Sequence, residues 1–305
     1  MSEEHRGLVV STGKNSAWVA LDGENVPRMA QLRRMRGRRS MPVPGDIAFV
    51  RPLEDGSTVI ERLEPRAMTL TRRTAEGRAK TIAANVDTLV IVMALAQPPP
   101  RFTILDQLLA FAELEGITAI VVWTKPDLAT PEEVLRRQGL YEALGYATLV
   151  VNPKSGSGVE TLRTMLLGRK ALLGGISGVG KSSIFRSLGG EAVVGEVSRH
   201  GLGRQTTTTA RLCRLDGGFL IDSPGVGDFG LGGIAPRELA AAFVEMRDVT
   251  ERCRFADCTH LHEPGCGIRQ AVERGEIEPE RYASYRQILG ALHERPGHDM
   301  VQGVS

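Results

Sequence analysis

One stretch, Gly175-Ile-Ser-Gly-Val-Gly-Lys-Ser182, constrains the fold of this chain more than any other. It follows the apolar run ALLGG, a predicted strand, and leads into KSSIFRSL, a predicted helix. Glycines at such a junction let backbone N–H groups turn toward phosphate oxygens, and the helix N-terminus adds a positive dipole. The spacing predicts a nucleotide phosphate loop, in which Lys181 reaches the β- and γ-phosphates and acts in catalysis, while Ser182 ligates Mg²⁺. The loop residues expected at the nucleotide are Gly175, Ser177, Gly178, Val179, Gly180, Lys181, Ser182 and Ser183.

The chain around this loop alternates predicted strands and helices from Ala84 onward. Three apolar strands, DTLVIVMALA, ITAIVVWT and ATLVVN, are separated by the amphipathic segments ILDQLLAFAELEG and PEEVLRRQGLYEALG. A helix over residues 159–167 precedes the phosphate-loop strand, and LCRLDGGFLIDSP predicts a hairpin after the loop. Buried strands joined by helices predict a parallel sheet covered on both faces. We therefore expect an α/β P-loop domain over residues 69–232.

The segments on either side of this domain have different patterns. Residues 1–68 contain short alternating stretches separated by turn residues, which predict a small closed barrel of the OB type. Six arginines and no acidic residue lie between Pro27 and Pro44 in a chain whose net charge is only +2. The Arg28–Arg39 run could therefore meet nucleic-acid phosphates, or it could be an ordinary solvated loop. Residues 233–305 are predicted to be mostly helical. The longest apolar run, LVIVMALA, is too short to span a bilayer, and nothing at the start of the sequence indicates export.

Thr124-Lys125-Pro126-Asp127, here called the base loop, follows the strand ITAIVVW. A carboxylate such as Asp127 can accept hydrogen bonds from N1–H and the exocyclic amine of guanine, whereas adenine offers neither in that arrangement. The stem of Lys125 would pack over the purine. GTPases usually carry Asn at the first position, so Thr124 departs from the pattern. Asn152-Pro153-Lys154 stands where GTPases tend to carry Ser-Ala-Lys, and Pro153 has no N–H for the guanine oxygen. Asn152 and Lys154 are therefore candidate contacts or plain loop residues.

Two later segments are expected around the γ-phosphate. Asp222 ends the apolar strand FLID, where its carboxylate could hold Mg²⁺ through water, and the N–H of Gly225 could meet the γ-phosphate. The threonine run 206–209 is predicted to sense the γ-phosphate by completing the Mg²⁺ shell. Thr207 and Thr208 are both candidates, and we assign the ligand and catalytic role to Thr208.

Cysteines gather near the end of the chain. Cys253, Cys258 and Cys266 lie within fourteen residues, with His260 between them. In a chain without signs of export, such clustering favours a metal over disulfides. Three thiolates and one imidazole make a closed tetrahedral set, which predicts one structural zinc rather than iron. His262 is an alternative ligand to His260. The fourth cysteine, Cys213, falls in a predicted strand and is expected in the core.

The base loop precedes the phosphate loop, which is the reverse of the order in an ordinary GTPase. When chain termini lie side by side, they can be joined and the chain cut elsewhere without changing the sheet. We therefore predict a circularly permuted GTPase domain. This order, together with IAANVD, SGVGKSS, the threonine run and CRFADCTH, resembles the ribosome small subunit-dependent GTPase A family over nearly the whole chain.

The resemblance implies GTP hydrolysis stimulated by the small ribosomal subunit, contact with its rRNA, and a role in late maturation of that subunit. It also points to His260 as the zinc ligand. We expect a cytoplasmic monomer. The family usually carries His before its threonines, where this chain has Gln205. Our hypothesis is that Gln205 orients the attacking water, because Val226 after the Asp-x-x-Gly motif cannot; a ribosomal group is the alternative.

Two other functions fit parts of the sequence. A P-loop ATPase or small-molecule kinase would share the phosphate loop, but Asp127 argues for guanine. A zinc-containing RNA-binding module with a purely structural nucleotide site would share every motif without turnover. Comparing nucleotide binding with hydrolysis separates these possibilities.

Overall fold

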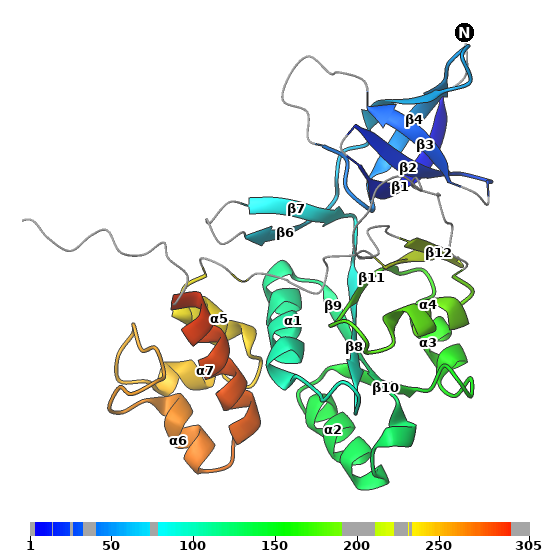
Figure 1. Cartoon of the computed structure of the whole chain (residues 1–305). Helices are drawn as coiled ribbons and strands as arrows, with labels where there is room; N and C mark the ends of the chain where they lie inside the picture. The colour runs from blue at the N-terminus through cyan, green and yellow to red at the C-terminus, as the bar shows by residue number, and fades with distance from the viewer. Residues whose placement is uncertain are drawn as a thin grey trace, which may run out of the picture.

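The computed structural model describes residues 4–13, 15–24, 27–32, 41–73, 79–190, 211–222, 231 and 234–293. Figure 1 shows three parts: an N-terminal barrel, a central sheet with helices on both sides, and a C-terminal group of helices. The C-terminal helices lie beside α1 of the central part, and the barrel lies beyond the opposite end of the sheet from α2. Among the described residues, no helix combines the length and apolarity that crossing a membrane requires.

The barrel confirms the prediction for the N-terminal segment. Its strands close in the order β1-β2-β3-β5-β4. They are β1 (His5–Thr12), β2 (Ser16–Leu21), β3 (Arg28–Leu32), β4 (Ile47–Pro52) and β5 (Thr58–Leu63). Alternate residues such as Val9, Val19 and Val50 fill the interior without exposure to solvent. In the arginine run, Arg28 forms an exposed ion pair with Glu24 at 2.7 Å, and residues 33–40 lie outside the described residues.

A two-stranded ribbon that the sequence pattern did not predict follows the barrel. It consists of β6 (Thr69–Arg73) and β7 (Ala79–Ala84), which pair antiparallel. The sequence pattern does not indicate these strands, because the arginines and lysine of the segment obscure the alternation of a strand. Buried Leu70 and Ala83 belong to the same apolar cluster as residues of the barrel and the central sheet.

The central sheet has the order β10-β9-β8-β11-β13-β12. Its strands are β8 (Thr88–Ala94), β9 (Thr118–Thr124), β10 (Ala147–Val151), β11 (Lys170–Gly174), β12 (Arg211–Leu215) and β13 (Gly218–Asp222). The first five in this order are parallel, and β12 pairs antiparallel with β13 as the predicted hairpin. Successive residues of β8 enter different clusters, since Leu89 and Ile91 pack on one face and Val90 on the other. This alternation confirms a parallel sheet buried on both faces.

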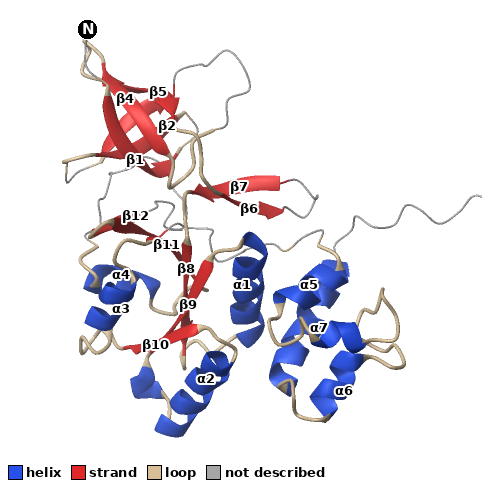
Figure 2. Cartoon of the chain, turned by 180° about the vertical axis from the view of Figure 1, so that it is seen from behind, coloured by secondary structure: helices blue, strands red, loops and turns tan. Residues whose placement is uncertain are grey.

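Helices α1 (Phe102–Glu115) and α2 (Pro131–Ala143) cover one face, while α3 (Val159–Met165) and α4 (Lys181–Ser187) cover the other, as Figure 2 shows. Helix α1 ends at Gly116, whose φ of 66° is left-handed and therefore favours glycine. Helix α2 begins after Thr130, whose hydroxyl accepts the N–H of Glu133.

The C-terminal helices are α5 (Pro236–Ala242), α6 (Gly267–Glu273) and α7 (Pro279–His293), with a 3₁₀ turn at Val249–Arg252. Buried Arg281 of α7 joins this part to the sheet domain. Its guanidinium lies 2.5 Å from the Asp106 carboxylate on α1 and 2.7 Å from Glu245, and the Tyr141 hydroxyl of α2 donates to Asp106 at 2.8 Å.

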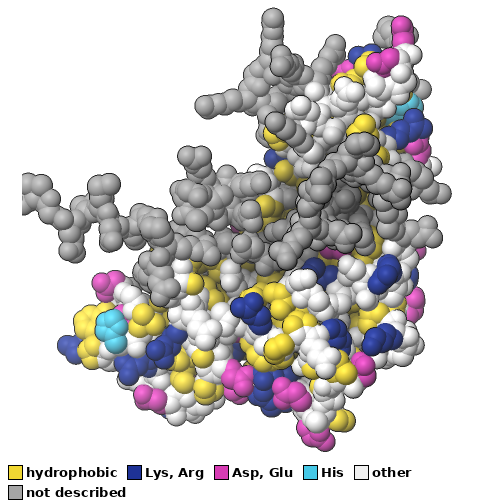
Figure 3. Space-filling view, in the orientation of Figure 1, with side chains coloured by type: hydrophobic (Ala, Val, Ile, Leu, Met, Phe, Trp, Pro, Cys, Tyr) yellow, Lys and Arg dark blue, Asp and Glu magenta, His cyan; other side chains and the backbone are white. Residues whose placement is uncertain are grey.

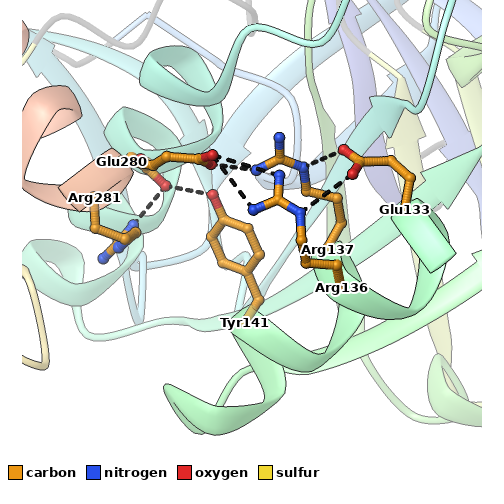
Figure 4. A network of polar contacts seen from close by, with 7 residues as sticks. Glu133, Arg136, Arg137, Tyr141, Glu280 and Arg281 are labelled. Atoms are coloured by element: carbon orange, nitrogen blue, oxygen red, sulfur yellow. Dashed lines mark hydrogen bonds and ion pairs between the residues drawn. The ribbon is translucent and has the colours of Figure 1, made fainter. Parts of the chain in front are cut away.

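A second set of ion pairs surrounds Glu280 at the same junction. Glu280 contacts Arg136 and Arg137 of α2, and both arginines also contact Glu133 (Figure 4). On the surface, basic and acidic side chains lie together where α2 meets the C-terminal helices (Figure 3). The segment that carries Cys253, Cys258, His260 and Cys266 therefore belongs to a packed group of helices that contacts α1 and α2 directly.

Candidate functional site

Parallel pairing brings the predicted nucleotide segments to one edge of the sheet. Strands β9, β8, β11 and β13 are neighbours in that order and run in the same direction. Their carboxyl ends therefore lie together, at Thr124, Ala94, Gly174 and Asp222. Open α/β sheets bind ligands outside the carboxyl ends of their strands. The fold places the base loop and the phosphate loop on this edge despite their reversed order in the chain.

The phosphate loop takes a backbone path that requires glycine. Gly175 has a φ of 128°, and a Cβ there would lie 2.4 Å from the carbonyl oxygen of Val92. Gly180 has a φ of 104° immediately before α4 begins at Lys181. The loop thus passes close to β8 and turns sharply into the helix, as the sequence spacing predicts.

Lys181 lies across its own loop. Its ammonium donates to the carbonyl oxygens of Gly175 and Ile176, both at 2.7 Å. Partial burial lowers the pKa of Lys181, and the nearby carboxylate of Asp222 raises it. The electrostatic effect of Asp222 at the end of β13 therefore reaches the phosphate-loop lysine, as expected for two groups of one site.

Two consecutive residues of the base loop contact two consecutive residues of the phosphate loop. The Thr124 hydroxyl lies 2.5 Å from the carbonyl oxygen of Val179, and the Lys125 ammonium lies 2.9 Å from that of Gly178. Lys125 also donates to the carbonyl oxygen of Gln97, in the loop after β8. These hydrogen bonds join segments more than fifty residues apart. The sequence did not indicate that Gln97 accepts a hydrogen bond from Lys125. The acceptor is a backbone oxygen, which every residue type has, so no sequence pattern marks it.

Asp127 and Asn152 face each other at the ends of β9 and β10. The exposed Asp127 carboxylate accepts a 3.4 Å hydrogen bond from the Asn152 amide. The other end of that amide, Oδ1, accepts the backbone N–H of Lys154 at 3.1 Å. Lys154 itself is exposed to solvent. Asn152 therefore contacts the predicted guanine-binding carboxylate.

Several predicted residues lie outside the described part of the chain. These residues are Gln205, Thr207, Thr208, Gly225 and Val226. Among the predicted phosphate-loop contacts, Ser177, Gly178 and Ser182 are exposed, Ser183 is half-buried, and Val179 is buried. Asp222 is partly exposed at the end of β13.

The predicted zinc ligands form one cluster. The ligand atoms of Cys253, Cys258, His260 and Cys266 all lie within 4.8 Å of one another. Nδ1 of His260 is 3.5 Å from Sγ of Cys253 and 3.6 Å from Sγ of Cys266. Bond lengths of about 2.3 Å for Zn–S and about 2.1 Å for Zn–N in a tetrahedron separate sulfur and nitrogen by about 3.6 Å, so the donor set fits zinc.

The cluster also decides between the two histidines. His260 is buried and belongs to the set, whereas His262 is exposed and does not. Cys213 is buried in β12, where Sγ contacts the carbonyl oxygen of Leu188. Burial raises the pKa of the Cys258 thiol to about 12, so a metal must displace a proton to bind there.

Three residues that the sequence pattern did not indicate support the ligand loop. Glu263 accepts the N–H groups of Thr259, Leu261 and His262 at 2.9–3.2 Å. Tyr282 and Tyr285 of α7 donate their hydroxyls to the carbonyl oxygens of His260 and Thr259, at 2.6 and 3.0 Å. The loop that carries His260 is thereby held in place by its own hydrogen bonds and by α7.

A doubly covered parallel sheet with joined base and phosphate loops, in reversed order, defines a circularly permuted P-loop GTPase. The RsgA GTPase family model matches residues 63–232. The chain belongs to the RsgA GTPase family, and it is a GTP hydrolase.

Individual relatives match over almost the whole chain. Small ribosomal subunit biogenesis GTPase RsgA of Ectopseudomonas mendocina is 40% identical, with 96% of this chain and 88% of the relative covered. The protein of the same name from Moorella thermoacetica is 39% identical, and the match covers 86% of this chain and 90% of the relative. The crystal structure of YjeQ from Thermotoga maritima superposes with a TM-score of 0.72 at 32% identity, covering 96% and 100%. YloQ, described as a circularly permuted GTPase, shares the fold with a TM-score of 0.68 at 24% identity, and the match covers 97% of each chain.

Proposed function

We propose that this GTPase acts in the biogenesis of the small ribosomal subunit, binds rRNA of that subunit, and hydrolyses GTP faster when bound to it. The biological role is supported by relatives about 40% identical over 96% of the chain, which are small ribosomal subunit biogenesis GTPases by name. The observation that best supports a GTP site is the pair of hydrogen bonds from Thr124 and Lys125 to the phosphate loop. They join the base loop to the phosphate loop, which supports a single nucleotide site.

The roles within this site follow from the chemistry of each group. Asp127 accepts hydrogen bonds from the guanine edge, and the stem of Lys125 packs on the purine. Lys181 leaves the carbonyl oxygens of its own loop for the β- and γ-phosphates. Ser182 and Thr208 would ligate the Mg²⁺ that neutralises phosphate charge. Asp222 would hold the same ion through a water molecule. Gln205 orients the attacking water when the protein is bound to the ribosome.

The remaining parts serve binding and assembly. We assign residues 1–68 to an RNA-binding barrel, 69–232 to the permuted GTPase domain and 233–305 to the zinc domain. The chain acts as a monomer alongside ribosomal subunits in the cytoplasm. Arginines of the barrel meet rRNA phosphates, so affinity for the subunit should fall steeply as salt rises.

Purified small ribosomal subunits are expected to raise the rate of GTP hydrolysis by at least about tenfold, since electrostatic groups supplied in trans can stabilise phosphoryl transfer. Large subunits serve as the control, and ATP as the control nucleotide. Phosphate release measured with and without subunits gives the result directly. Equal rates with both subunits would contradict the proposal, and tight GTP binding without turnover would favour the structural nucleotide site instead.

Removal of one zinc ligand provides a separate test of the metal site. Cys266→Ala is expected to abolish zinc binding and lower the melting temperature, because a closed four-ligand site contributes directly to folding. The matched control is Cys213→Ala, which changes a buried cysteine outside the cluster. Metal analysis of the purified proteins should give about one zinc per chain for the control. Equal zinc content in the two variants would rule out the assignment.

A further inference from the structure

We propose that Arg214 is a positioning residue through which the N-terminal barrel acts on GTP hydrolysis. Arg214 lies on β12, the edge strand of the central sheet, and its guanidinium is hydrogen-bonded to the barrel. The inference rests on the proposed function, because it concerns how small ribosomal subunits raise the rate of hydrolysis. The sequence placed this residue only in a predicted hairpin.

The barrel covers one face of β12. Leu212 belongs to the apolar cluster that contains Leu8 and Val10 of β1, whereas Cys213 belongs to the cluster on the other face of the sheet. Both views of the chain show β1 beside β12 (Figure 1, Figure 2). Because side chains alternate along a strand, Arg214 shares the barrel-facing side with Leu212. The barrel therefore covers this end of the sheet on the face where α1 and α2 cover other strands.

Arg214 is bonded to main-chain atoms of the barrel. Its Nη2 donates to the carbonyl oxygens of Ala20 and Leu21, at 3.0 Å each. Both acceptors lie at the end of β2, beyond Val19, where the pairing of β2 with β3 stops. A guanidinium is planar and presents its donors in fixed directions. The two hydrogen bonds therefore fix the end of β2 relative to β12.

The strand β12 connects this contact to the nucleotide edge of the sheet. It pairs antiparallel with β13, and its first residue, Arg211, lies opposite Asp222, the carboxylate proposed to hold Mg²⁺. On the other face of β12, Sγ of Cys213 contacts the carbonyl oxygen of Leu188 at 3.5 Å, at the end of the helix that follows the phosphate loop. A displacement of β12 is therefore transmitted both to the end of β13 and to α4.

The junction between the barrel and the sheet leaves room for movement. A cavity of about 680 Å³ lies there, and the exposed side chains of Arg214 and Lys170 are part of its lining. The junction with the C-terminal helices is different, because the ion pair of Arg281 and Asp106 is almost fully buried there. Domains move relative to one another unless their interface is large and apolar. The barrel is therefore the part whose position on the sheet can respond to a partner.

Binding of rRNA to the barrel would then act on hydrolysis through Arg214. An RNA that favours one position of the barrel increases the population of that position. Because Arg214 is bonded to β2, β12 follows the barrel, and Asp222 on the next strand shifts relative to the phosphate loop. Arg214 itself lies opposite Phe219, near the amino end of β13 and away from the nucleotide edge. Basal hydrolysis therefore does not depend on it.

The test measures GTP hydrolysis by the full-length protein, without subunits and with saturating small ribosomal subunits. Saturation removes the effect of any change in affinity for the subunit. Arg214→Met keeps a long side chain but removes every donor. We expect an unchanged basal rate and a stimulated rate lower by at least about fivefold, the smaller end of typical coupling between two sites. Arg214→Lys, which keeps the charge and can still donate, should retain most of the stimulation.

Lys170→Met is the matched control. Lys170 is an exposed cation at the same cavity, and among the described residues its ammonium makes no hydrogen bond to the barrel. Its replacement should leave the basal and the stimulated rate unchanged. Thermal unfolding verifies that each variant is folded, and Arg214→Gln takes the place of Arg214→Met if the latter does not fold.

The outcomes are distinct. An unchanged ratio of stimulated to basal rate in Arg214→Met would overturn the inference. Equal loss of both rates would also overturn it, because Arg214 would then only maintain the structure of the site. The same loss of stimulation in Lys170→Met would assign the effect to charge in the cavity instead. Absence of stimulation in the unmodified protein would contradict the proposed function on which the inference rests.

Discussion

Lys181→Ala is expected to lower the rate of GTP hydrolysis by at least about a hundredfold, the scale seen when a group that stabilises transition-state charge is removed. In the structure the ammonium is held by two carbonyl oxygens of the phosphate loop at 2.7 Å each. These contacts keep the charge inside the loop, where we propose that the phosphates bind. Burial already lowers the pKa of Lys181, so a bound anion relieves a partly desolvated cation as well as gaining a partner.

The matched control is Lys170→Ala. Lys170 is exposed at the opposite end of β11, the strand that leads into the phosphate loop. The same loss of charge at that distance should leave the rate within about twofold, because exposed charges are strongly screened. The measurement is single-turnover hydrolysis at saturating GTP, with and without small subunits. Equal losses in the two variants would mean that Lys181 has no special role.

The second large effect is on stability. Arg281→Met is expected to lower the free energy of unfolding by about 3–5 kcal/mol, because it leaves buried acidic partners without their cation. Arg281 and Asp106 have side chains 2% and 1% exposed, and Glu245 is 9% exposed. The melting temperature should fall by roughly 10 °C, as measured by circular dichroism or calorimetry.

The pH dependence gives this prediction a second signature. Burial raises the pKa of Asp106, and the charge of Arg281 opposes that rise. Without Arg281 the pKa should rise further, so Asp106 is more protonated in the folded than in the unfolded chain. Stability then decreases as pH rises through the folded pKa. We expect the variant to lose more stability at pH 8 than at pH 5.

An exposed arginine of the same domain serves as the control. Arg274 pairs with Glu276 at 2.6 Å, and their side chains are 48% and 43% exposed. Arg274→Met should therefore change stability by less than about 1 kcal/mol. If it destabilises the protein as much as Arg281→Met, burial of the ion pair is not the cause.

The sequence alone determined the features that depend on short, local patterns. The phosphate loop was predictable because its glycines, lysine and serine must stand at set spacings between a strand and a helix. The Cys3His cluster was predictable because thiolates and imidazole are rare and lie within fourteen residues of one another. Alternating strands and helices indicated the parallel sheet, and the order of motifs indicated its permutation. In each case the informative pattern lies either within one contiguous stretch of sequence or in the order of such stretches along the chain.

Only the tertiary structure decided which side chains meet across those segments. The pattern missed the β6–β7 ribbon and treated Thr124 as the loss of an amide. Spacing alone left His262 as an alternative to His260, and only the family resemblance pointed to His260. The partners of Thr124 and Asn152 come from neighbouring loops at the sheet edge, and Arg281 meets Asp106 at a separation of 175 residues. Such contacts depend on strand order and helix packing, which bring distant residues within hydrogen-bonding distance without leaving a local pattern in the chain.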